Sequence, residues 1–181
     1  MASAFSHALM AITIGKTYST KISSIKFIVL GCFCAVIPDA DVIMNHFVAY
    51  ESFFGHRGFF HSFFFCFLLA VLITYVFFRK EKLQLKTKLI YILFFFLCGA
   101  SHGLLDMLTN GGRGVAIFSP FDNTRYFFPW RPIKVSPIGI AKFFSERGLK
   151  VILSEMIWIG IPCFLYMFFI KLIRKGNNRN K

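Results

Sequence analysis

Histidine and aspartate residues gather in a few short stretches of this 181-residue chain. The densest stretch, residues 38–62, opens with Pro-Asp-Ala-Asp and closes with His-Arg-Gly-Phe-Phe-His-Ser. Apolar runs flank it, and ionisable groups beside hydrocarbon are costly, so such a cluster indicates a functional site. Imidazole and carboxylate ligands without a thiolate suit zinc, with manganese or iron as alternatives. The candidate metal ligands are His7, Asp41, His61, His102 and Asp106.

His102 and Asp106 are four residues apart, so on a helix they share one face. Two ligands on one helix hold a metal economically, as in the zincin helix; a plain His–Asp hydrogen bond is the alternative. His56 and His61 are five apart and would lie about 140° apart on a helix. We therefore expect His56 to end a loop and His61 to lie in the first turn of a span. His56 and Arg57 would then support the ligands or contact substrate.

Asp39 and Asp41 flank Ala40 directly after Pro38. In a non-helical turn both could reach one ion, one as a ligand and the other through water or as general base. Capping of a helix end is the alternative. A catalytic ion would lower the pKa of a bound water and polarise a phosphoryl or carbonyl oxygen. The candidate catalytic residues are Asp39, Asp41 and His56.

Arginines mark the segment between residues 109 and 150. A guanidinium group matches the geometry of a phosphate, so Arg125 and Arg131, together with Arg57, are the candidate substrate-binding residues. A basic surface that lies on anionic headgroups is the alternative.

The composition is that of a membrane protein. The chain is 56% hydrophobic, contains 26 phenylalanines and has a mean hydropathy of +0.63. We expect one all-α domain over residues 1–181, a polytopic helical bundle with about five membrane segments. Two of these are short or kinked, at 4–15 and 25–37, and three are full spans, at 59–78, 89–108 and 151–170. Residues 109–150 form a long extramembrane segment.

The net charge of +13 would suggest nucleic acid as the partner of a soluble chain. In a membrane protein it indicates basic flanks on the cytoplasmic side, and we expect no nucleic acid. The short basic segments are 16–26, 79–88 and the tail 171–181, and five membrane segments put all three on one side. The tail is then cytoplasmic, and the His and Asp residues meet at the outer face. The five cysteines are expected to be buried free thiols.

The motifs together resemble the YdjM-type family of inner-membrane, metal-dependent hydrolases. That family is in turn similar to zinc-dependent phospholipase C and related nucleases. The resemblance implies a multi-pass protein of the bacterial inner membrane with its site at the periplasmic face. It also implies that His7, Asp39 or Asp41, His61, His102 and Asp106 are the ligands. The residues that carry the resemblance are His7, 38–41, 56–62, 102–106, Ser119-Pro-Phe and 125–130.

One departure from the relatives concerns the number of ions. No histidine follows His102 here, whereas the relatives have later ones. We therefore expect one ion, or two that share Asp106.

The expected function is metal-dependent hydrolysis of a phosphate ester, in a lipid or lipid-linked substrate that reaches the site from the bilayer. A metal transporter or sensor with the same side chains is the alternative, and bis-histidine haem binding is a third.

Overall fold

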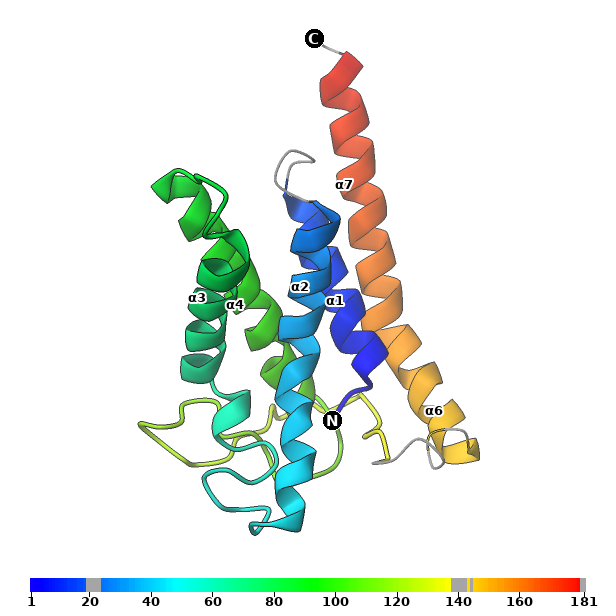
Figure 1. Cartoon of the computed structure of the whole chain (residues 1–181). Helices are drawn as coiled ribbons and strands as arrows, with labels where there is room; N and C mark the ends of the chain where they lie inside the picture. Colours follow the sequence, from blue (N-terminus) through cyan, green and yellow to red (C-terminus); the bar gives the residue numbers. More distant parts are fainter. Residues whose placement is uncertain (19–23, 138–142, 144, 180–181) are drawn as a thin grey trace.

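The computed structural model describes residues 1–18, 24–137, 143 and 145–179. Its helices run up and down as a bundle, and the irregular segments gather at one end (Figure 1). In chain order the elements are α1 (Ala4–Thr17), α2 (Ile25–Val36), the 3₁₀ helices η1 (Ile37–His46) and η2 (Phe59–His61), α3 (Phe63–Phe78), α4 (Leu85–Met107), α6 (Glu146–Glu155), the π-helical turn η3 (Met156–Gly160) and α7 (Ile161–Arg179).

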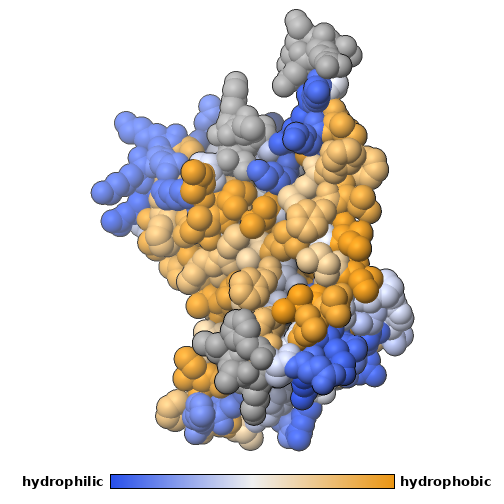
Figure 2. Space-filling model, turned by 90° about the vertical axis from the view of Figure 1, so that its right-hand side faces the viewer, coloured by the Kyte–Doolittle hydropathy of each residue, from blue (hydrophilic) through white to orange (hydrophobic). Residues whose placement is uncertain are grey.

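The bundle has the dimensions of a membrane protein. Three helical runs are long and apolar enough to cross a bilayer: Ile25–His46, Leu85–Met107 and Glu146–Gly176. The helices α3, with 16 residues, and α1, with 14, are shorter. On the face shown in Figure 2, an apolar band lies between two hydrophilic ends. The expected all-helical membrane architecture is confirmed.

The second segment is longer than the 25–37 expected. At Ile37 the α2 helix passes directly into η1, and the helical run continues to His46. Pro38 is tolerated because it lies in the first turn of η1, where its missing N–H is not needed.

The third segment, expected as one span over 59–78, is divided. Ser62 has an extended backbone, and its Oγ accepts the N–H of Phe65 at 3.1 Å. This is an N-cap, so α3 begins at Phe63, and His61 lies before the helix instead of in its first turn.

The last segment begins earlier and ends later than the 151–170 expected. Its helical run starts at Glu146 and reaches Arg179, so the segment expected to be extramembrane ends before α6 and most of the basic tail is helical. In the expected extramembrane segment, residues 138–142 and 144 lie outside the described residues. In the basic tail, residues 180–181 do.

The two ends of the bundle differ in charge. The described parts of the three basic segments, 16–26, 79–88 and the tail, lie together at one end (Figure 1). The N-terminus, η1, the loop before α3 and the loop after α4 lie at the other end.

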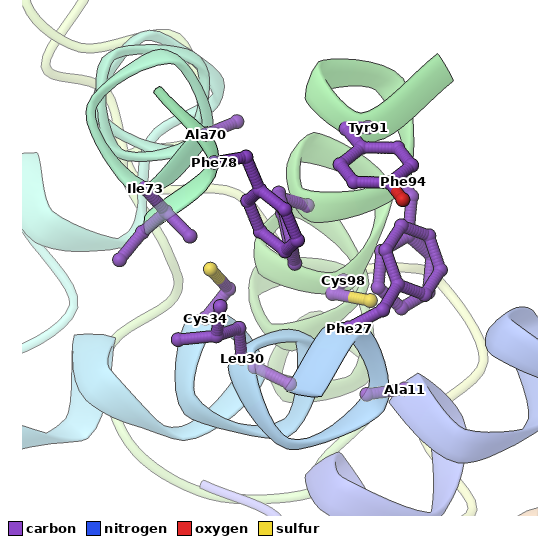
Figure 3. Close-up of a cluster of buried hydrophobic side chains, with 12 residues drawn as sticks. Ala11, Phe27, Leu30, Cys34, Ala70, Ile73, Phe78, Tyr91, Phe94 and Cys98 are labelled. Atoms are coloured by element: carbon purple, nitrogen blue, oxygen red, sulfur yellow. The ribbon is translucent and has the colours of Figure 1, made fainter. Parts of the chain in front are cut away.

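An aromatic core packs α2 against α3 and α4 (Figure 3). Phe27 stacks on Phe94 with ring centroids 3.9 Å apart, and Phe95 and Cys98 are also fully buried. On α4 these residues precede His102, so the core lies between the His and Asp residues and the basic end. All five cysteines are free thiols, and four of them are buried.

A buried carboxylate joins the last helix to the first. Glu155, 5% exposed, accepts hydrogen bonds from the backbone N–H and hydroxyl of Ser3 and, at 2.8 Å, from the hydroxyl of Ser6. A negative charge at a helix N-terminus also complements the helix dipole. Glu155 therefore holds the start of α1, directly before His7.

Glu155→Gln should lower the free energy of unfolding by roughly 2–3 kcal/mol, because it weakens charge-assisted bonds to donors that stay buried. Thermal unfolding in detergent would show a fall in Tm of roughly 5–10 °C. Glu146→Gln on the same helix is the control, since Glu146 is exposed and its ion-pair partner among the described residues is Lys150. Equal Tm values for the two variants would contradict this role of Glu155.

Candidate metal centre

Three segments bring histidine and aspartate side chains to one point. Asp39 comes from η1, His61 from η2, and His102 and Asp106 from α4. One nitrogen or oxygen of each lies within 4.8 Å of the others. The side chain of Asp39 is 11% exposed, whereas the other three are buried.

Four of the six separations between these atoms bracket the spacing of ligand atoms around a tetrahedral zinc ion. Nε2 of His61 lies 3.0 Å from Nε2 of His102, 3.6 Å from Oδ1 of Asp39 and 3.8 Å from Oδ2 of Asp106. His102 Nε2 lies 3.3 Å from Asp39 Oδ1. Bonds of about 2.0–2.2 Å to a tetrahedral zinc ion place its ligand atoms about 3.3–3.6 Å apart. Oδ1 of Asp39 has no hydrogen-bond partner among the described residues, and Oδ2 of Asp106 forms an ion pair with Arg57. The four side chains could therefore hold a metal ion.

Both imidazoles turn the same nitrogen toward this point. Nδ1 of His102 lies 2.7 Å from the carbonyl oxygen of Ala35. A carbonyl only accepts, so Nδ1 carries the proton and Nε2 keeps its lone pair. Nδ1 of His61 lies 3.0 Å from Oδ2 of Asp41. Such a partner behind the ring orients a metal-binding histidine.

Electrostatics at His61 favour a positive charge. Burial lowers the pKa of His61, but the carboxylates of Asp39 and Asp41 overcome this effect and raise it to about 9. A metal cation would supply the same charge after displacing the proton.

A glycine allows η2 to approach α4 this closely. A Cβ atom at Gly103 would lie 2.9 Å from the carbonyl oxygen of His61 and 2.7 Å from Cδ1 of Ile117. Any larger residue would push His61 away from His102.

Asp39 and Asp41 contact opposite sides of the His61 ring. In a 3₁₀ helix, with three residues per turn, positions two apart point about 120° apart. Asp39 accordingly faces Nε2, while Asp41 faces Nδ1 and also lies 2.5 Å from Nδ1 of His56. The turn at Asp39 and Asp41, expected to be non-helical, is part of the 3₁₀ helix η1. Asp41 lies on the side of the His61 ring that faces away from Asp39. Asp41, His56 and His61 form a second group that could hold an ion.

Arg57 links the aspartates and the following loop. Its Nε lies 3.0 Å from Oδ2 of Asp106, and its backbone N–H donates to Asp41 Oδ2 at 3.1 Å. The terminal guanidinium nitrogens donate to Gly111 O and Thr109 Oγ1. Arg57 is 1% exposed and has φ 64°, a strained conformation for a non-glycine residue that such contacts must stabilise.

The first helix adds His7 beside the group of four. Its ring stacks on His102 with centroids 3.8 Å apart, and its Nε2 lies 3.6 Å from Oδ1 of Asp106. That oxygen also accepts the backbone N–H of Ala2 at 2.7 Å. His7 is fully buried, and neither ring nitrogen has a hydrogen-bond partner among the described residues. The ring could turn a nitrogen to the same ion.

The candidate substrate-binding arginines lie differently. The guanidinium of Arg125 donates to the carbonyl oxygens of His56 and Tyr50, so it fastens the loop before η2. Arg131 is exposed and covers the ring of Phe127 at 4.7 Å. His46, which has no assigned role, is exposed at the end of η1.

The sequence reasoning missed several groups that hold the candidate site in place. The N–H of Ala2 and the carbonyl of Ala35 are backbone groups, which leave no mark in a side-chain pattern. Thr109 gave no signal either. Glu155 did, as an acid inside the last apolar run, but its partners lie about 150 positions away.

Comparisons with known proteins agree with this architecture. The chain is 35% identical over 168 residues to the inner membrane protein YbcI of Escherichia coli strain K12, an alignment that covers 92% of this chain and 95% of that protein. No solved structure matches. The sequence model of the YdjM inner membrane protein family matches residues 1–177, and the chain therefore belongs to that family.

Proposed function

We propose that the chain is a membrane-embedded, metal-dependent hydrolase that cleaves a phosphate ester of a lipid or lipid-linked molecule. The observation that carries this proposal is the convergence of two imidazole nitrogens and two carboxylate oxygens, within 4.8 Å of one another, around one point. The point lies near one end of the helical bundle, and we place that end at the depth where lipid phosphates meet water.

His61, His102 and Asp106 would hold the ion. Two histidines and one carboxylate, with one position left open, are a usual set for catalytic zinc, and manganese or iron suit the same ligands. His7 is placed to add a third nitrogen, as a fourth ligand. A bound ion lowers the pKa of a water molecule and polarises a phosphoryl oxygen.

The remaining residues orient the ligands and move the proton. Asp39, the one partly exposed member of the group, accepts the proton of the attacking water. Asp41 and His56 fix the orientation of His61. Arg57 balances the charge of Asp106.

The alternative, a metal transporter or sensor, finds less support in the packing. A transporter needs polar groups that continue across the bundle. Instead the aromatic core around Phe27 and Phe94 fills the bundle between the site and its basic end (Figure 3). Haem binding is disfavoured because Nε2 of His61 and His102 are only 3.0 Å apart, too close for a haem between them.

The orientation follows from the positive-inside rule. The basic end of the bundle would face the cytoplasm and the site the periplasm, with five crossings. Reporter fusions at Lys82 and at the C-terminus should then both report the cytoplasm, and a fusion near Gly112 the periplasm. Opposite signals from Lys82 and the C-terminus would exclude five crossings.

His102→Ala and Asp106→Asn should each lose most bound zinc, because each removes a ligand from the ion. The metal-to-protein ratio of the purified protein, measured by elemental analysis, gives the answer. Glu81→Gln is the control: Glu81 pairs with Lys26 at the opposite end of the bundle, and both are part-exposed. If both variants bind as much zinc as the wild type, His102 and Asp106 are a structural contact and not metal ligands.

Asp39→Asn should keep zinc and lose roughly 10²–10⁴-fold in turnover, the usual contribution of a general base. Asp41→Asn should instead weaken zinc binding by roughly 10–100-fold, because it removes the partner that orients His61. Zinc content and hydrolysis of lipid phosphoesters, measured on the same preparations, separate the two. A sensor or transporter predicts that metallated Asp39→Asn keeps full function. Loss of zinc from it would make Asp39 a ligand.

A further inference from the structure

A cavity opens beside the candidate metal centre. It has a volume of about 310 Å³, and its wall includes His56 and Arg57. His56 contacts Asp41, and Arg57 contacts Asp106. A group bound in this cavity would therefore lie one side chain away from the ligands.

The cavity wall is positively charged. Among the described residues, the wall contains two guanidinium groups, those of Arg57 and Arg147, and no carboxylate. Asp106 balances Arg57. Arg147 lies in the first turn of α6, is exposed, and forms no ion pair with the residues that the structure describes, whereas its neighbour Glu146 pairs with Lys150. Met1, whose amino group faces the charge of Asp106, also lines the cavity. Arg147 is therefore the described guanidinium of the wall that has no carboxylate partner among the described residues.

The position and size of the cavity indicate what enters it. Its wall comes from the loops before η2 and after α4 and from the start of α6, at the loop end of the bundle, and includes the polar residues Tyr50 and Ser136. No residue of the apolar helices α3 or α7 lines it. About 310 Å³ is at the lower limit for ligand pockets, enough for a small polar group.

We propose that this cavity binds the phosphate-bearing headgroup of the substrate and that Arg147 is the residue that holds its anionic group. The proposal rests on the function proposed above for the same site. The guanidinium fork of Arg147 meets phosphate oxygens in two directions, and Arg57 closes the inner wall. The headgroup is thereby held at the mouth of the metal centre, while any acyl chains stay outside in the bilayer.

Binding of inorganic phosphate to the zinc-loaded full chain in phosphatidylcholine nanodiscs, measured by calorimetry, tests the proposal. Arg147→Ala should weaken binding by roughly 10–100-fold, the loss expected for a charge-assisted bond, and Arg147→Lys should restore part of it. Lys150→Ala, which removes a charge of the same sign from the same helix outside the cavity, should bind as the wild type does. Wild-type affinity in Arg147→Ala, or no phosphate binding by the wild type, would overturn the proposal.

Two competitors identify the source of the phosphate. Displacement by phosphatidic acid added to the nanodisc indicates a lipid headgroup, and displacement by glycerol 3-phosphate alone indicates a soluble ester. Either result supports phosphate binding in the cavity.

Turnover is a separate readout. If phosphate binding depends on Arg147 but no phosphoester is hydrolysed, the proposed hydrolase function is wrong and the phosphate-binding role of the cavity stands. If Arg147→Ala hydrolyses substrate with an unchanged KM, the hydrolase function stands and the role of the cavity is wrong.

Discussion

The buried contact between Arg57 and Asp106 is the interaction on which the rest of the site depends. A carboxylate with no exposed surface at the end of an apolar bundle is prohibitively costly without a cation and hydrogen bonds beside it. Arg57 meets that need, and the same residue binds Asp41 through its backbone and Thr109 through its side chain. Asp41 on η1, Asp106 on α4 and the loop after α4 are thereby tied to one residue.

The second requirement is that the first and last helices close the bundle around the site. His7 can stack on His102 only if the start of α1 stays in place, and Glu155 holds it there from the last helix. The last helical run thus supports the site in two ways. Glu155 holds the start of the helix that carries His7, and Arg147, as we propose, binds the substrate. Neither contribution involves a residue of the recognisable His and Asp motifs.

Sequence reasoning worked best where hydrophobicity left few alternatives. Charged groups in apolar segments must meet one another, so hydropathy and residue type are enough to group His61, His102 and Asp106. The substrate contacts expected of the arginines stay predictions. Residue type and spacing do not show whether a guanidinium meets a substrate or a backbone carbonyl, and Arg125 donates to two such carbonyls. Helix bounds were also misjudged, because Pro38 is compatible with a 3₁₀ continuation.

The sequence alone determined the helical membrane architecture, the metal-compatible chemistry of the His and Asp residues and their convergence at one end. These follow from hydropathy, charge bias and residue type, which are local properties. Only the tertiary structure decided that Asp39 faces the ligands while Asp41 stands behind His61. It likewise placed Glu155 against α1. Such choices depend on the direction of each side chain and on contacts between distant segments, and packing sets both.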